Sequence, residues 1–154
     1  MEPLELVQKY YDQTDAPSRD FEDNWIEPDF KMADAPLGLW FEGREQHWAF
    51  AQAVAAANPD PESGQTAASG QTVQCHEYLG SPDRGVIRWT WTARGATVPR
   101  IFGLAPVPGE FKVQGLGLVT FRNGRLATLE EFWDSADLRR RLGADIPQPK
   151  IPSA

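Results

Sequence analysis

Two runs rich in Val, Leu, Phe and Thr, residues 111–122 and 125–133, flank the pair Asn123-Gly124. An Asn-Gly pair suits a type I′ turn, because both central residues of that turn take a positive φ. This pattern is the clearest indication of a β-hairpin in the chain. We expect the other elements to be organised around that hairpin.

The second strand of the predicted hairpin carries two adjacent carboxylates, Glu130 and Glu131. Side chains alternate faces along a strand, so the two must point in opposite directions. Glu131 shares its face with the apolar residues Ala127, Leu129 and Trp133. If that face is covered, desolvation raises the pKa of the Glu131 carboxyl group and suits it to work as a general acid or base. The competing interpretation is a salt bridge or an exposed edge strand.

Elsewhere, the spacing of apolar residues predicts helices over residues 4–11, 19–25, 44–57 and 136–142. Alternation predicts further strands over residues 29–32, 72–79 and 86–93. Ser18 and Ser135 are the N-cap candidates of the second and the last helix. Residues 34–41 are expected to form an irregular apolar loop across a cavity mouth, and residues 60–70 and 95–109 to form Gly- and Pro-rich loops.

The two strands before the hairpin have distinct faces. In the strand over 72–79, alternation groups Gln74, His76 and Tyr78 on one face, and Val73, Cys75 and Leu79 on the other. In the strand over 86–93, the apolar face holds Ile87, Trp89, Trp91 and Ala93. Gly115 and Gly117, inside a hairpin strand, are expected to mark a bend or bulge.

Helices come first along the chain, followed by three or four antiparallel strands and a terminal helix. This order is typical of an α+β fold. We expect a curved antiparallel sheet wrapped around the N-terminal helices, forming a cone with an internal pocket. Residues 1–154 are expected to be a single domain, with an extended Pro-rich tail from about residue 146.

The amino-acid composition argues against several classes of partner and of metal site. A formal net charge of −7 argues against nucleic acid or an anionic membrane surface as a partner, and no apolar run is long enough for a membrane span. Cys75 is the only cysteine, so no intramolecular disulfide can form, and with two histidines a structural zinc site is not expected. We expect no metal, and a reducing cytoplasmic setting.

Several short motifs resemble the SnoaL-like polyketide cyclase family. The motifs are Phe102-Gly-Leu-Ala-Pro-Val-Pro-Gly109, Phe121-Arg-Asn-Gly-Arg-Leu126, Glu131-Phe-Trp-Asp134 and Leu138-Arg-Arg-Arg-Leu-Gly143. In the N-terminal half, Trp25-Ile-Glu-Pro-Asp-Phe30 and Phe41-Glu-Gly-Arg-Glu-Gln46 fit as well. The resemblance covers most of the chain.

The resemblance implies a barrel-like cone shared with nuclear-transport-factor-like proteins and ketosteroid isomerases. It also implies an acid/base carboxylate on the last strand, no metal or cofactor, and a homodimer. Counted from Gly124, the matching carboxylate is Glu131, where the family commonly has Asp. The family's His in a Gly-Thr-His-like segment has no match in Thr92-Ala-Arg-Gly-Ala-Thr97.

Four further polar residues are candidates for the site. Asp134 suits either a substrate contact or the cap of the final helix. His76 and Tyr78 are potential donors to an enolate or carbonyl oxygen, or belong to a half-exposed strand face. His47 lies beside Trp48 in the third helix and is either a substrate contact or a rim residue whose polar groups are satisfied.

The aromatic candidates have two interpretations. Trp89 and Trp91 suit either a core or a pocket wall that stacks on a planar substrate. Trp40 and Phe41, in the predicted loop, are candidates for a lid. Arg88 could bind an anionic group or pair with a surface carboxylate.

These features favour a cofactor-independent enzyme that uses a pocket carboxylate on a hydrophobic, carbonyl-containing substrate. Cyclisation, isomerisation, dehydration and epoxide opening all fit, and proton abstraction next to a carbonyl is the step on which we rely most. One alternative is a non-catalytic module of the same fold that binds a hydrophobic ligand. Another is a structural dimerisation domain without a pocket.

Overall fold

The computed structural model describes residues 1–14, 16–57, 71–94 and 107–142. The predicted loop over 60–70, most of the 95–109 connection and the Pro-rich tail lie outside the described residues. The helices are α1 (Pro3–Asp12), α2 (Arg19–Trp25), the 3-10 helix η1 (Ala35–Leu37), α3 (Arg44–Ala57) and α5 (Ala136–Leu142). The strands are β1 (Ile26–Asp34), β2 (Leu39–Glu42), β3 (Gln71–Ser81), β4 (Arg84–Arg94), β5 (Glu110–Arg122) and β6 (Arg125–Trp133).

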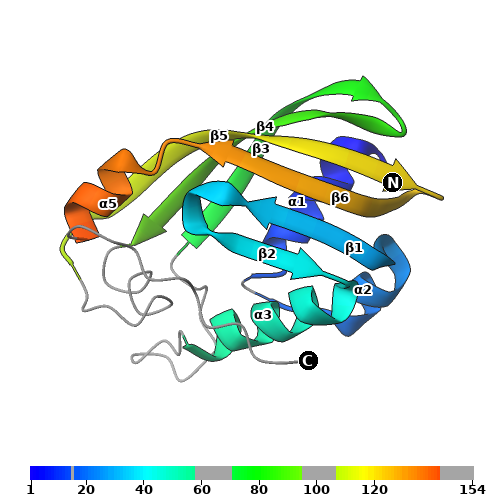
Figure 1. The fold of residues 1–154 in the computed structure, drawn as a ribbon, viewed down its shortest axis with the longest axis horizontal. Coiled ribbons are helices and arrows are strands. Elements are labelled where there is room, and N and C mark those ends of the chain that lie inside the picture. Colours follow the sequence, from blue (N-terminus) through cyan, green and yellow to red (C-terminus); the bar gives the residue numbers. More distant parts are fainter. Residues whose placement is uncertain (15, 58–70, 95–106, 143–154) are drawn as a thin grey trace.

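In the described part of the chain, six strands form one twisted sheet in the order β2-β1-β6-β5-β4-β3 (Figure 1). Every neighbouring pair is antiparallel except β1 and β6, which run parallel. The α+β class is therefore confirmed, but the expected three or four antiparallel strands were too few. The strand predicted over residues 29–32 is the middle of β1, which the pattern shortened because Pro28 interrupts the alternation and the β1–β6 register shifts between Ile26 and Lys31. The strand that the pattern missed is β2.

The predicted irregular loop over residues 34–41 is instead an ordered turn and a strand. The Asp34 side chain accepts a hydrogen bond from the Leu37 main-chain N–H at 3.2 Å, which begins η1. Gly38 follows with a φ of 65°, a left-handed conformation that glycine adopts without strain. The chain then reverses into β2, which pairs with the end of β1.

The predicted hairpin is confirmed. Asn123 and Gly124 both take a positive φ, 54° and 73°, as a type I′ turn requires. β5 and β6 pair on either side of this turn, with one register shift between Thr120 and Phe121. Beyond the shift, Leu129 and Glu131 lie on the inner face and Glu130 lies on the outer face.

The helices α1 and α3 lie against the inner face of the sheet, and α5 lies at one end of it (Figure 1). The Gln8 side chain of α1 bonds to the free edge of β3. Its amide nitrogen donates to the Val73 carbonyl oxygen at 2.8 Å, and its amide oxygen accepts from the Cys75 N–H at 2.8 Å. One side chain thus satisfies two edge groups that would otherwise be unpaired.

Two details of the strands differ from expectation. A register shift between Cys75 and Glu77 turns Tyr78 to the inner side and leaves Leu79 63% exposed, the reverse of simple alternation. Gly115 forms no bulge, because the register with both neighbouring strands is regular there. Instead, a Cβ at Gly115 would lie 2.3 Å from the Trp89 ring, so the glycine makes room for that indole.

The helix caps are as expected for α2 but not for α5. The Ser18 hydroxyl accepts from the Phe21 N–H. At α5 the carboxylate of Asp134 accepts from the Ala136 N–H at 2.8 Å, while the Ser135 hydroxyl accepts from the Arg139 guanidinium. None of the described helices is long and apolar enough to cross a membrane.

Candidate active site

A cavity of about 120 Å³ lies between α1, α3 and the inner face of the sheet. It is close in size to the engineered cavity of about 150 Å³ that binds benzene. The described residues around it are mostly aromatic and aliphatic, with a few polar groups among them. They are Tyr10, Tyr11, Thr14, Met32, Asp34, Leu37, Leu39, Phe41, His47, Phe50, Val54, Gln71, Val73, Trp89, Trp91, Glu131 and Trp133.

Glu131 stands on the inner face of β6 and is 5% exposed. The Tyr11 hydroxyl, which reaches across from α1, donates a hydrogen bond to Glu131 Oε1. Burial raises the pKa of Glu131 to about 8. The hydrogen bond from Tyr11 opposes this rise, and the nearby Asp34 adds to it. Near neutral pH, Glu131 is therefore mainly a carboxylic acid that can itself donate a proton.

Asp34 is the second carboxyl group of the cavity and was not predicted. It ends β1 directly opposite Glu131 in the parallel β1–β6 pair, so both side chains project from the same region of the sheet. Asp34 Oδ1 accepts from Trp133 Nε1 at 3.0 Å and from the Leu37 N–H. Burial raises the pKa of Asp34 to about 6, against the opposing effect of these two hydrogen bonds.

The charge balance of the cavity is unusual. Among the described residues that line it there are two carboxyl groups and no lysine or arginine. A buried carboxylate without a cation is costly unless it is protonated or hydrogen-bonded. The cavity therefore favours the protonated forms of both carboxyl groups. Their pKa values are about two units apart.

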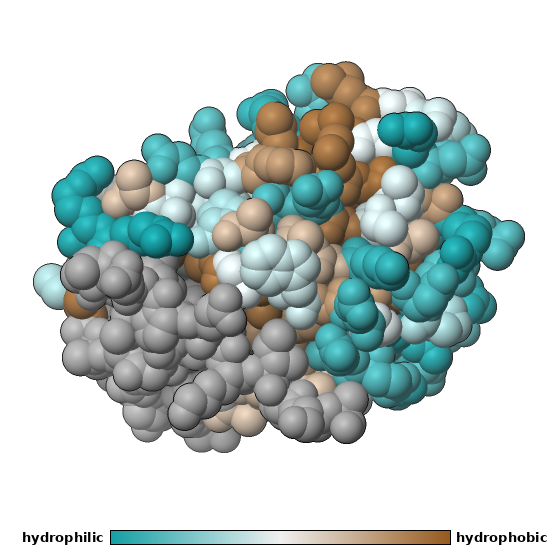
Figure 2. All heavy atoms as spheres, viewed as in Figure 1, coloured by the Kyte–Doolittle hydropathy of each residue, from teal (hydrophilic) through white to brown (hydrophobic). Residues whose placement is uncertain are grey.

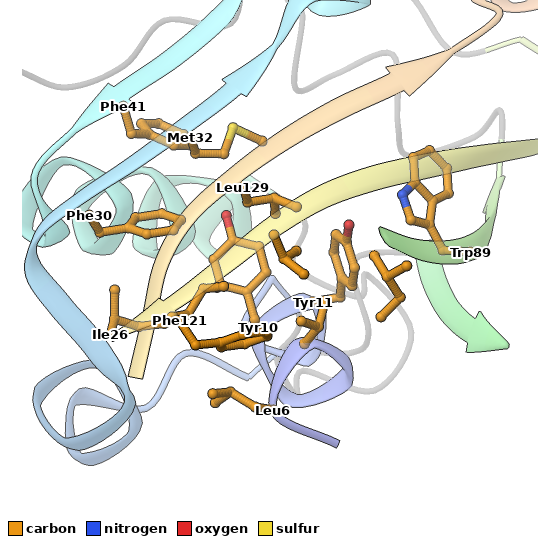
Figure 3. Packing of buried hydrophobic residues seen from close by; sticks show 14 of the residues in the cluster. Leu6, Tyr10, Tyr11, Ile26, Phe30, Met32, Phe41, Trp89, Phe121 and Leu129 are labelled. Atoms are coloured by element: carbon orange, nitrogen blue, oxygen red, sulfur yellow. The ribbon is translucent and has the colours of Figure 1, made fainter. Parts of the chain in front are cut away.

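Aromatic rings form much of the wall. Trp89 and Trp91 both line the cavity, as one interpretation of the sequence predicted, and Trp91 packs against Trp133 with ring centroids 5.9 Å apart. Figure 3 shows Tyr10 and Tyr11 rising from α1 with their hydroxyl groups pointing toward the sheet. Burial raises the pKa of both tyrosines well above the ordinary value, so both remain phenols that can donate.

His47 also belongs to the cavity wall and is not a rim residue. It is 2% exposed, stacks on Tyr10 with ring centroids 4.7 Å apart, and has Phe30 and Phe41 at its edges. Phe41 itself is buried in β2 and lines the cavity, as part of a paired strand rather than of a mobile lid.

Three of the predicted polar residues lie away from the cavity. His76 is exposed on the outer face of the sheet, where its Nε2 is 2.7 Å from the Thr90 hydroxyl. Asp134 is exposed and caps α5. Arg88 is exposed on the outer face, with its Nε 3.6 Å from Glu77. For each of these residues, the sequence allowed a role in the site or a structural role at the surface, and the observed position agrees with the structural role.

Two of the aromatic candidates also lie away from the cavity. Trp40 is 54% exposed, because it alternates with Phe41 in β2 and so faces outward. Tyr78 lies at the far end of β3, where its hydroxyl donates to the Ser81 carbonyl oxygen and its ring meets Phe121 at 6.2 Å. Neither residue lines the cavity around Glu131.

Sequence reasoning missed Asp34 and Tyr11, although a signal for each was present. Phe30, Met32 and Asp34 alternate in β1, so a longer predicted strand would have placed Asp34 on the buried face. Tyr11 was recognised only as an apolar position of the first helix. Its hydroxyl on a buried helix face was the signal for a hydrogen-bonding role. Within the described residues, no three His, Cys, Asp or Glu side chains gather in a way that could hold a metal ion.

No protein-family model matches the sequence, and no curated protein matches it. Several solved structures are similar to the chain. A candidate SnoaL-like polyketide cyclase from Jannaschia sp. CCS1 is 20% identical, with 94% of each chain covered and a TM-score of 0.65. IdmH from Streptomyces antibioticus, a candidate polyketide cyclase, is 19% identical, with 94% of this chain and all of that one covered and a TM-score of 0.62.

A third similar structure is a hypothetical protein with a ketosteroid isomerase-like fold from Catenulispora acidiphila, in complex with trimethylamine. It is 15% identical, covers 95% of this chain and 97% of its own, and has a TM-score of 0.65. At these identities the likeness establishes the fold. The expected cone, shared by SnoaL-like and ketosteroid isomerase-like proteins, is therefore confirmed.

Proposed function

We propose that this chain is a cofactor-independent acid/base enzyme that removes a proton next to the carbonyl group of a small, neutral, apolar substrate. The observation that carries the proposal is the pair of carboxyl groups, Asp34 and Glu131, which face one apolar cavity from adjacent strands. Two titratable groups whose environments separate their pKa values are the usual basis for dividing the acid and base roles.

Asp34 suits the role of base. Its pKa of about 6 leaves it mostly ionised at neutral pH while keeping it more basic than an exposed carboxylate. Oδ1 is engaged by two donors, and among the described residues none donates to Oδ2. That oxygen can accept the proton from the carbon next to the carbonyl.

Glu131 and Tyr11 suit the role of stabilising the negative charge that develops on the substrate oxygen. Tyr11 donates to Oε1, so a proton on Glu131 is left on Oε2 for the substrate oxygen. Ketosteroid isomerases use a related arrangement, an Asp base with a tyrosine and a protonated aspartic acid as donors. The one extra methylene of Glu places the donor further from β6 than an Asp would.

The cavity also supports a substrate class. Its volume of about 120 Å³ suits one ring, and its tryptophans suit a planar apolar compound. Its two carboxyl groups, with no lysine or arginine among the described lining residues, disfavour an anion. Cyclisation, isomerisation and dehydration of such a carbonyl compound share enolisation as their first step.

Enolisation can be tested without knowing the natural substrate. Exchange of the α-protons of cyclohexanone for deuterium in D₂O, followed by ¹H NMR, measures this step alone. We expect exchange above the buffer rate, a loss of about 10²- to 10⁴-fold in Asp34→Asn, and a loss of about 10- to 100-fold in Glu131→Gln, whose amide is a weaker donor.

The matched control is Glu130→Gln, the same substitution one residue earlier on the exposed outer face, which should leave exchange unchanged. Binding of cyclohexanone with no exchange above the buffer rate would favour the non-catalytic binding module. Equal effects of Glu130→Gln and Glu131→Gln would remove the basis for the assigned roles.

A further inference from the structure

A second pair of buried ionisable groups includes His47 of the cavity wall. His47 Nδ1 of α3 lies 2.6 Å from Glu22 Oε1 of α2, and the two side chains are 3% and 0% exposed. The atoms are close, but their alignment falls short of that of a hydrogen bond, and Glu22 Oε2 is buried without a hydrogen-bond partner among the described residues. The roles of Asp34 and Glu131 make no use of this pair.

The surroundings of Glu22 make His47 its charge partner. The nearby Arg44 pairs with Asp23 at 3.3 Å, and its guanidinium donates to main-chain carbonyl oxygens, including that of Glu22 at 3.3 Å. No described contact joins Arg44 to the Glu22 carboxyl group. A fully buried carboxylate is costly without a proton, a hydrogen bond or a positive charge beside it, and His47 is the described group close enough to supply one.

The two ring nitrogens of His47 have different surroundings, because Nδ1 faces Glu22 and Nε2 does not. Nδ1 faces Glu22, Tyr10 stacks on the ring, and the imidazole lines the cavity. No described protein group bonds to Nε2. A carboxylate that orients an imidazole through one nitrogen and stabilises its protonated form is the arrangement that prepares the other nitrogen for proton transfer.

We infer that His47 is a second proton-transfer residue of this cavity and that Glu22 is its positioning residue. The inference rests on the proposed function, which it extends to substrates that carry a hydroxyl group β to the carbonyl. Asp34 takes the proton from the α-carbon, a C=C bond forms, and the β C–O bond breaks. The leaving oxygen takes its proton from His47 Nε2 and departs as water, and solvent returns the proton from Asp34 to His47.

Two probes of one ring size separate the steps. Deuterium exchange into cyclohexanone needs the base and the donors at the carbonyl oxygen. Dehydration of 3-hydroxycyclohexanone to 2-cyclohexenone, followed by ultraviolet absorbance, also needs a proton at the leaving oxygen. We expect His47→Gln to lower dehydration by about 100-fold or more and to lower exchange at least about tenfold less than that, so that the ratio of the two rates changes. Glu22→Gln should shift the ratio in the same direction but less strongly.

His76→Gln, the same substitution on the outer face, is the matched control and should alter neither rate. Imidazole added to His47→Ala should restore part of the dehydration rate and leave exchange unchanged, which a purely structural role would not produce. Thermal unfolding of each variant identifies any loss of fold.

Each outcome has one meaning. Equal losses of exchange and dehydration in a folded His47→Gln variant would overturn the inference and assign His47 a packing role. Exchange without any dehydration by the unaltered chain would overturn it too, while leaving the proposed function in place. Absence of exchange would defeat the proposed function and the inference with it.

Discussion

At the scale of single residues, the decisive feature is a carboxyl group placed where water is scarce. Glu131 lies among aromatic rings and a phenol, and burial is the largest cause of its raised pKa. Its neighbour in sequence, Glu130, is exposed. Alternation along one strand therefore gives two identical side chains very different environments.

The pKa of Glu131 makes folding stability depend on pH. The group titrates near 4.5 when unfolded and near 8 when folded, so between these pH values the folded chain holds a proton that the unfolded chain lacks. Its stabilising contribution is complete below pH 4.5 and is lost as the pH rises through 8. From pH 6 to pH 8 we expect the free energy of unfolding to fall by about 2 kcal/mol through this group.

Urea denaturation at the two pH values measures this fall. Glu131→Gln should flatten the dependence, because the amide does not titrate, while Glu130→Gln should preserve it. A Glu131→Gln variant with the original slope would show that another group is responsible.

At the scale of elements, strand β5 has a glycine where the Trp89 side chain lies across it. Gly115 lies opposite Trp89 of β4 and Trp133 of β6, and it leaves the space that the Trp89 indole fills. Trp89 in turn packs near Tyr11, with ring centroids 6.4 Å apart. Through Trp89, a change at Gly115 of β5 is therefore connected to Tyr11, which donates the hydrogen bond to Glu131.

Gly115→Ala should destabilise the fold by about 1–3 kcal/mol through overpacking, because its Cβ would overlap the Trp89 ring and displace it. Chemical denaturation measures the loss. Trp89→Leu should be destabilising alone but should remove most of the additional cost of Gly115→Ala, giving a favourable coupling in a double-mutant cycle. Additive effects of the two substitutions would mean that the alanine is accommodated in some other way.

At the scale of the whole molecule, the two faces of the sheet differ. The inner face encloses the cavity. The outer face, shown in Figure 2, carries a band of apolar side chains over the central strands. Leu116, Leu118 and Phe132 are each 45–47% exposed there, beside a groove of about 530 Å³. Exposed apolar surface of this kind is typical of a protein interface.

We propose that this outer face pairs with a second copy of the chain, in line with the homodimer that the resemblance to SnoaL-like proteins implies. Light scattering after size exclusion should give twice the 17.2-kDa mass of one chain. Leu118→Lys should shift the mass to that of a monomer, because it places a charge in the apolar band. Gln52→Lys, on an exposed position of α3, introduces the same residue elsewhere and should leave the dimer intact. A monomer before any substitution would contradict the proposal.

Local patterns in the sequence were sufficient for the helices, the hairpin and the strand face that Glu131 shares with Leu129. These features depend on contacts between near neighbours: turn conformation at Asn123-Gly124, capping at Ser18 and the alternation of side chains in a strand. The resemblance to SnoaL-like proteins added the cone. The single-domain organisation of residues 1–154 stays a prediction.

Only the tertiary structure decided which polar residues meet. Asp34 faces Glu131 because β1 runs parallel to β6, a pairing between segments nearly a hundred residues apart that no local pattern encodes. Tyr11 reaches Glu131 because α1 lies across the sheet, and a register shift turned Tyr78 to the inner side of β3, far from the cavity. The sequence determined which groups are available for chemistry, and the long-range strand pairing decided which of them lose water and act together.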